Sequence, residues 1–320
     1  MAEISFRKVR KTFPNGKEAI KDLDLEISHG EFLVLTGPSG SGKVTVLRMI
    51  AGMEPLSSGE LRINGELVEN GNPKKRNMGM IFQHYTLYPG MTVYDNIGFA
   101  LKLHGAPEEE IRRAVEETAK LYKVDQLLSC YPRELNPLQK QYVAMARASV
   151  HKPEAFLLLD PLGSLDTASR KMARERLKSL HKETGTTLLY VTESAEEAVK
   201  LGARTVVMRR GRIEQQGPVE ELLKKPKNRF VAQYMNGDRF MVSEVEIHQG
   251  KTAVEAIGEE FSVDVPPEWI ERLEQAGTIG SRVFMGYMAE EPEDGEELKH
   301  IPAPDSRFYF FDRETGNSIG

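Results

Sequence analysis

The chain has 320 residues, a formal net charge of −5, and 40% hydrophobic against 28% charged residues. This length favours about two domains of roughly 150 residues each, and the acidic balance gives no support to nucleic-acid binding, which usually needs a basic face. A single cysteine, Cys130, excludes an internal disulfide and fits a reducing compartment. The N-terminus lacks the apolar core of a signal peptide, and no run of about 18 apolar residues is present, so we expect any membrane role to come through a partner.

The first predicted elements are short strands at residues 4–9 and 23–27, followed by a strand–turn–helix unit. Residues 31–36 are apolar enough for a buried strand, and residues 45–51 suit a helix closed by a glycine. Between them Gly37–Thr45 reads Gly-Pro-Ser-Gly-Ser-Gly-Lys-Val-Thr, which has the spacing of a phosphate-binding P-loop as far as the lysine. Backbone N–H groups and the helix dipole would then attract an anion. The alternative is a chance glycine-rich turn, which the lysine and both flanking elements disfavour.

The later elements alternate between helices and buried strands. Pro107-Glu108-Glu109-Glu110 predicts a helix start, and apolar residues then recur at helical spacing. Uninterrupted apolar strands are typical of a parallel sheet covered on both faces, and they are predicted at residues 156–159, 187–191 and 205–208. Beyond residue 236 the pattern changes to short strands and glycine turns, with a helix around 269–275 and an acidic, solvated loop at 290–295. The basic runs at 74–76 and 224–227 are interpreted as solvated surface.

Further segments fall at the spacing of one family. They are Met80–Pro89, Met91–Ile97, Leu135–Gln139 with Gln141–Ala148, Pro161–Asp166, and Gly211–Gln215 with Gly217–Leu222. Together with the P-loop they resemble the ATP-binding-cassette (ABC) ATPases, in particular the subunit of maltose and multiple-sugar importers. The likeness runs from the N-terminus to about residue 236, and a weaker one extends into the tail, where Phe308–Phe311 resembles the final strand of the family's small regulatory β-barrel.

The resemblance implies an α/β fold, with a P-loop NTPase core, an antiparallel β subdomain and a helical subdomain at about residues 88–150. Residues 1–235 would form the nucleotide-binding domain, and residues 236–320 a shortened, β-rich domain similar to an OB-like barrel. It also implies a peripheral protein on the cytoplasmic face of the cell membrane. Residues 85–97 would receive the membrane subunits, and the chain would form a homodimer or a heterodimer with an active ABC ATPase, with no nucleic acid and no direct membrane insertion.

The same resemblance assigns the nucleotide contacts. Phe13 would stack on adenine, for which the alternative is a turn or core aromatic. Lys43 would reach the terminal phosphates, and Gln83 would touch metal and water as the remaining metal contact. Asp166 would cross the dimer interface. The P-loop positions that would line the phosphates are Gly37, Ser39, Gly40, Ser41, Gly42, Lys43, Val44 and Thr45.

Departures from the family pattern fall on the positions that perform hydrolysis. Val44 replaces the hydroxyl residue that ligates magnesium, and Glu193 replaces the histidine that contacts the γ-phosphate. Leu159 stands at the magnesium-supporting aspartate and Asp160 at the general-base glutamate. Asp160 could instead be the metal aspartate shifted by one, but the spacing favours the gap-free alignment, and adjacent strand residues face opposite sides. Under either interpretation one carboxylate is absent.

The signature loop also departs from the family, because Leu135–Gln139 reads Leu-Asn-Pro-Leu-Gln instead of Leu-Ser-Gly-Gly-Gln. Proline removes a backbone donor, and leucine blocks the close approach that glycine would permit. We therefore expect weak ATP binding, doubtful magnesium binding, and hydrolysis that is impaired or lost. Three hypotheses follow: a non-hydrolysing subunit docked on membrane subunits, a working transport ATPase coupled to sugar uptake, and a free regulatory pseudo-ATPase.

Overall fold

The computed structural model describes residues 2–68, 73, 76–83, 86–237, 240–250, 253–259, 261–289, 302–303 and 306–319. The chain divides into two compact units. The first comprises Met1–Glu193 and Ala203–Ile213, and the second comprises Ser194–Gly202 and Glu214–Gly320. The expected domain boundary near residue 236 stays a prediction, and the acidic loop predicted at 290–295 lies outside the described residues.

The first unit contains an antiparallel sheet of order β2-β1-β4-β5. Its strands are β1 (Ile4–Thr12), β2 (Glu18–Ile27), β4 (Ser58–Ile63) and β5 (Glu66–Leu67). Apolar residues alternate along β1 and β2, and Phe6, Leu23 and Ile27 from these strands are buried. The strands predicted at residues 4–9 and 23–27 are therefore confirmed.

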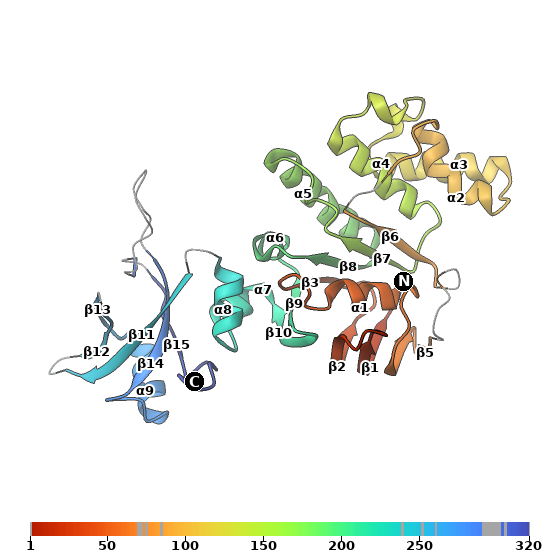
Figure 1. Cartoon of the computed structure of the whole chain (residues 1–320). Helices are drawn as coiled ribbons and strands as arrows, with labels where there is room; N and C mark the ends of the chain where they lie inside the picture. Colours follow the sequence, from red (N-terminus) through yellow and green to blue (C-terminus); the bar gives the residue numbers. More distant parts are fainter. Residues whose placement is uncertain are drawn as a thin grey trace. The chain divides into compact units, whose positions relative to one another are not determined.

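A second, mostly parallel sheet has the order β10-β9-β3-β8-β7-β6. Its strands are β3 (Phe32–Thr36), β6 (Met78–Ile81), β7 (Ala155–Leu159), β8 (Thr187–Thr192), β9 (Arg204–Arg209) and β10 (Arg212–Pro218). The pairs β3–β8, β3–β9, β7–β8 and β6–β7 are parallel. All six residues of β8 are buried, as expected for a strand covered on both faces. The helix α1 (Lys43–Ile50) follows β3 and buries Val46 and Leu47 in the same core (Figure 1).

The helical part of the first unit contains α2 (Val93–Leu103), α3 (Glu108–Leu121) and α4 (Pro137–Ser149), with short 3-10 turns at Asp125–Leu127 and Pro132–Glu134. Figure 1 shows α2, α3 and α4 grouped at one end of this unit. The apolar face predicted for α3 is confirmed, because Ile111, Val115 and Ala119 are buried. Pro107 directly precedes the first helical residue, where its missing N–H leaves no intrahelical bond unmade.

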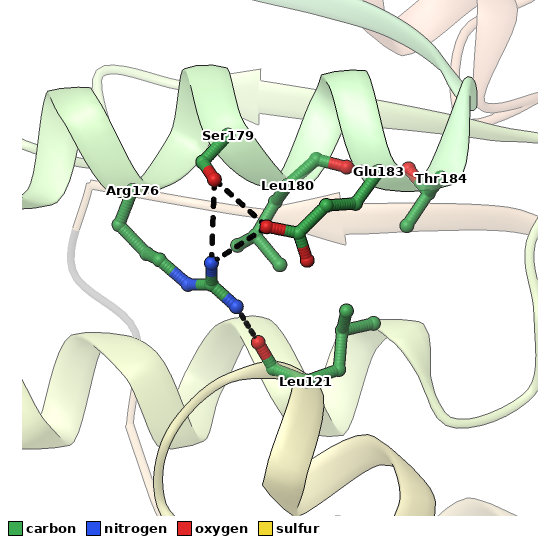
Figure 2. Close-up of polar contacts among 6 residues, drawn as sticks. All are labelled: Leu121, Arg176, Ser179, Leu180, Glu183 and Thr184. Atoms are coloured by element: carbon green, nitrogen blue, oxygen red, sulfur yellow. Dashed lines mark hydrogen bonds and ion pairs between the residues drawn. The ribbon is translucent and has the colours of Figure 1, made fainter.

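Arg176 connects the core helix α5 (Thr167–Thr184) to the end of α3 (Figure 2). One guanidinium nitrogen of Arg176 donates to the Leu121 carbonyl, and the other lies 3.0 Å from a Glu183 carboxylate oxygen. Ser179 donates to that same oxygen over 2.7 Å. Leu121 is the last residue of α3, so its carbonyl has no partner within the helix. The negative end of the α3 dipole also stabilises the half-buried Arg176 cation.

We expect Arg176→Met to lower the free energy of unfolding of the chain by about 1.5–3 kcal/mol, the range for a hydrogen bond to a charged group. Methionine keeps the apolar stem but leaves the Leu121 carbonyl without its donor. Urea unfolding followed by far-UV circular dichroism measures the change. Glu183→Gln is the matched control, because it removes the ion pair and leaves the contact with Leu121. Equal destabilisation by the two variants would show that the carbonyl contact contributes nothing.

The second unit contains short helices and a five-stranded antiparallel sheet of order β13-β12-β11-β14-β15. The helices before the sheet are α6 (Ala195–Leu201), α7 (Val219–Lys224) and α8 (Arg229–Asn236). The strands are β11 (Phe240–Gln249), β12 (Val254–Ile257), β13 (Ser262–Asp264), β14 (Arg282–Met288) and β15 (Tyr309–Phe311), and α9 (Pro267–Gln275) lies between β13 and β14. Trp269 packs edge-on against Phe310 with ring centroids 5.3 Å apart. The aromatic run at 308–311 therefore contributes to this unit's core, as predicted.

None of the described helices is long and apolar enough to cross a membrane.

Candidate functional site

The loops that carry the predicted site residues all leave the same edge of the parallel sheet. The P-loop follows β3, Glu193 follows β8, Asp160 follows β7, and Gln83 lies just past β6. These four strands are neighbours in the order β3-β8-β7-β6, so the structure brings the four loops together. Ligands of open α/β sheets bind at this carboxyl edge. The grouping depends only on strand order and direction, and alternating apolar patterns in the sequence do not specify strand order.

Two glycines shape the P-loop. Gly37 has φ +149°, and a Cβ placed on it would lie 2.1 Å from the Met208 carbonyl oxygen on β9. Gly42 has φ +107°, and its Cβ would lie 2.7 Å from the Ala19 carbonyl oxygen. Both positions therefore need a residue without a side chain. The loop ends at Lys43, the first residue of α1, so backbone N–H groups at the helix start face the loop.

Lys43 is buried beneath the P-loop, with a side chain that is 2% exposed. Its ammonium donates to the Gly37 carbonyl over 2.7 Å, to the Pro38 carbonyl over 2.8 Å and to the Ser41 hydroxyl over 3.2 Å. A Glu193 carboxylate oxygen lies 3.7 Å from the same nitrogen, and that side chain is 61% exposed. Burial lowers the pKa of Lys43, and the Glu193 carboxylate opposes this effect by favouring the charged form.

The P-loop residues 37–43, called the cradle below, suit nucleotide phosphates, because they combine close-packed glycines, a helix start and a lysine. Two side chains near the cradle carry no oxygen that could ligate a divalent cation. Val44 is half-buried in the first turn of α1, and Leu159 ends β7, and neither carries an oxygen ligand. Within the described part of the chain, no group of three or more His, Cys, Asp or Glu side chains is placed to hold a metal ion. Hard cations such as magnesium need oxygen ligands.

Asp160 sits in a tight turn after β7, at φ +40°. Its carboxylate accepts a hydrogen bond from the Thr192 hydroxyl over 3.5 Å. A Cβ placed on Gly163 would lie 2.4 Å from the other carboxylate oxygen, so the Asp160 side chain covers that glycine. Aspartate is one of the few residues besides glycine that adopt this left-handed conformation readily. The role predicted for Asp160, at the position of the general base, stays a prediction.

The remaining predicted contacts lie on turns and in helix caps. Phe13 is half-buried in the turn after β1, and the Lys11 ammonium lies 5.1 Å from its ring centroid. Ser39 and Gly40 are exposed, whereas Ser41 is buried, and Thr45 and Gln83 are half-buried. Asn136 caps α4, because its side chain accepts from the Gln139 N–H over 2.8 Å and Gln139 accepts in return from the Asn136 N–H. Asp166 caps α5 through the Ser169 N–H over 2.9 Å.

Arg76 corrects one interpretation of the sequence. The run at 74–76 was expected to be solvated surface, but Arg76 is 7% exposed and donates to the carbonyls of Met49 and Ile50. These are the last carbonyls of α1, so a cation supports the P-loop helix at its C-terminal end. Lys74 and Lys75 lie outside the described residues. The run of basic residues does not reveal this contact, because the Met49 and Ile50 carbonyls lie 27 and 26 residues away in the chain.

Asn96 holds the loop before α2 in place. The family resemblance predicts this segment as part of the docking surface, but it does not single out Asn96. The Asn96 side chain is fully buried. Its amide nitrogen donates to the carbonyls of Tyr88, Met91 and Thr92, and its oxygen accepts from the Tyr88 N–H over 2.8 Å. Arg147 on α4 adds a hydrogen bond to the Thr86 carbonyl over 2.9 Å. The loop from 86 to 92 is thus held from two helices.

A groove of about 790 Å³ opens beside this loop, along α2 and the start of α3. It mixes apolar and charged side chains and is lined by Met91, Tyr94, Asp95, Gly98, Phe99, Lys102, Leu103, Ala106, Glu108 and Ile111. Leu103 is 73% exposed, an unusual value for a leucine at the rim of such a groove.

Comparison with known proteins gives a consistent result. The model of a family described as ABC transporter matches residues 20–163. The sn-glycerol-3-phosphate import ATP-binding protein UgpC of Chromohalobacter salexigens is 38% identical over 315 residues, which cover 95% of this chain and 85% of that protein. The trehalose import ATP-binding protein SugC of Mycobacterium tuberculosis is 48% identical over 235 residues, which cover 73% of this chain and 60% of that protein. Among solved structures, the dimeric ATP-binding cassette MJ0796 in a post-hydrolysis state with ADP and Pi has a TM-score of 0.58 at 28% identity, covering 67% of this chain and 98% of that one.

Proposed function

The chain belongs to the ATP-binding proteins of ABC transporters, and from this premise we propose that it is the nucleotide-binding subunit of a sugar-type importer, with ATP hydrolysis impaired or lost. Relatives that are named as import ATP-binding proteins for sn-glycerol 3-phosphate and trehalose support the importer class. The dimeric cassette MJ0796 supports pairing of two such domains. The subunit would lie on the cytoplasmic face of the cell membrane, bound to the membrane subunits.

The proposal rests on a contrast between the cradle, which suits phosphate, and the side chains next to it, which do not suit phosphoryl transfer. Gly37, Gly42 and Lys43 keep the geometry that binds phosphate. Glu193 instead brings a carboxylate to 3.7 Å from the Lys43 ammonium, where phosphoryl transfer needs positive charge. Val44 and Leu159 add hydrocarbon at positions where oxygen ligands would hold a cation. Phosphoryl transfer depends on positioning and on charge neutralisation, so these changes act on the same step.

The groove along α2 and α3 supports docking on membrane subunits. It lies beside the loop that Asn96 and Arg147 hold in place, and this loop is part of the segment 85–97 predicted to receive those subunits. A groove lined by both apolar and charged side chains suits a short amphipathic helix of a partner. Docking would therefore not require hydrolysis, because the groove and its loop use different residues from the nucleotide site.

Phosphate release from ATP by the purified chain tests the proposal. With magnesium present, we expect the chain to release no more phosphate than Lys43→Ala, which serves as the background for contaminating ATPases. The same preparation should bind nucleotide equally with and without magnesium. Turnover of about one per second or more, within the usual range of enzymes, that is abolished by Lys43→Ala would contradict the proposal.

A further inference from the structure

Glu193 is the feature of the cradle that its proposed nucleotide binding leaves unexplained. Strands β3 and β8 are parallel neighbours with Thr36 opposite Thr192, so Gly37 and Glu193 begin adjacent loops. Glu193 reaches the Lys43 ammonium from the solvent side, since its side chain is 61% exposed while that of Lys43 is 2% exposed. A carboxylate therefore stands at the mouth of the cradle, next to a buried cation.

The place of Glu193 matters for the length of the phosphate chain. In a P-loop the backbone N–H groups hold the α- and β-phosphates, and the lysine reaches the β- and γ-phosphates. The third phosphate thus extends furthest past the loop, toward the region of the lysine that Glu193 covers. A diphosphate ends within the cradle of backbone donors. The two ligands differ mainly in the charge that they bring close to this carboxylate.

We propose that Glu193 makes this cradle select nucleoside diphosphates over nucleoside triphosphates. The inference rests on the proposed function, because it assumes that the cradle binds nucleotide. Glu193 is then a specificity-determining residue, acting by its charge on the terminal phosphate.

Other contacts of Lys43 do not produce this selectivity. Its hydrogen bonds to the carbonyls of Gly37 and Pro38 must loosen for any phosphate to bind the ammonium. That requirement applies to diphosphate and triphosphate alike. The carboxylate differs, because it neutralises the ammonium that would otherwise attract the third phosphate and also repels that phosphate directly.

The size of the effect follows from the exposure of Glu193. Two like charges about 4 Å apart change an affinity roughly fivefold in water and about a thousandfold at an effective dielectric of 20. Glu193 is mostly exposed, so solvent screens its charge and the lower part of this range applies. We expect ADP to bind about five- to twentyfold more tightly than ATP.

Isothermal titration calorimetry on the full chain, with ADP and with ATP in the presence of a chelator, measures both dissociation constants without hydrolysis. Glu193→Gln keeps the shape of the side chain and removes its charge, and it should bring the ratio of the two constants close to one. Glu109→Gln is the matched control, because Glu109 is an exposed carboxylate on α3 that pairs with Arg112. This control lowers the net negative charge equally and should keep the preference for ADP. Far-UV circular dichroism checks that each variant is folded.

The outcomes separate this inference from the proposed function. Equal affinity for ADP and ATP in the unmodified chain, or a preference that survives Glu193→Gln, would overturn the role of Glu193 and leave the non-hydrolysing subunit intact. Absence of binding by either nucleotide would overturn both. Magnesium-dependent turnover together with a preference for ADP that Glu193→Gln removes would support the inference and overturn the proposed loss of hydrolysis.

Discussion

Replacing Gly37 by alanine should lower the free energy of unfolding by about 3–5 kcal/mol, because the change adds overpacking to backbone strain. The new Cβ would lie 2.1 Å from the Met208 carbonyl oxygen, a backbone atom of β9 that cannot rotate away. Relief requires β3 and β9 to separate or the P-loop to move. Movement of the loop also displaces the backbone N–H groups that would face a phosphate, so we expect nucleotide affinity to fall at least about tenfold.

Gly40→Ala separates overpacking from backbone strain as causes of the lower free energy of unfolding. Gly40 also has a positive φ of +74°, but a Cβ there meets nothing within 4 Å. Its substitution should therefore cost about 1–2 kcal/mol from the backbone alone. Urea unfolding followed by far-UV circular dichroism gives the stabilities. Trp269 is the only tryptophan and lies in the second unit, so its fluorescence shows whether a shift arises there instead. A loss for Gly37→Ala no larger than that for Gly40→Ala would refute the steric argument.

The sequence predicts the local structure of this region well, for reasons that the structure makes clear. Phe32–Thr36 forms a mostly buried strand and Lys43 starts a helix, because apolar runs, glycines and helix formers act over a few neighbouring residues. The fully apolar 187–191 segment likewise indicated a strand covered on both faces. The order of these strands is a property of the whole chain, so the closeness of the Asp160, Glu193 and Gln83 loops had to come from the family resemblance.

Long-range polar contacts were beyond the reach of sequence patterns. Arg76 looked like part of a basic surface run, yet it caps a helix whose last residues lie 26 and 27 positions earlier. The family resemblance places Glu193 at the position of the histidine that contacts the γ-phosphate, and the sequence does not indicate its ion pair with Lys43. Both contacts depend on which loops the sheet places side by side. They are decided by tertiary structure, whereas residue propensity decides the strands and helices that carry them.

We expect Asn96→Ala to destabilise the chain by about 2–4 kcal/mol, with the effect concentrated in the loop from 86 to 92. The variant removes a fully buried amide whose two N–H donors are shared among three carbonyls and whose oxygen accepts one bond. A hydrogen bond contributes about 1 kcal/mol, and its backbone partners are left in need of new ones. The expected local signature is faster amide hydrogen exchange in this loop, because the Tyr88 N–H loses its acceptor. Hydrogen exchange followed by mass spectrometry measures this signature.

Two further variants show whether the donors of Asn96 or only its volume hold the loop. Asn96→Asp keeps the shape and an acceptor for the Tyr88 N–H, but it turns an oxygen toward three carbonyls, so it should accelerate exchange in the loop as well. Asp95→Asn changes the neighbouring residue, whose carboxylate accepts from the exposed Thr92 hydroxyl, and should leave the loop unchanged. If Asn96→Asp behaved like Asp95→Asn, packing alone would position the loop. If the donors of Asn96 hold the loop, they also fix the shape of the surface that we propose for docking.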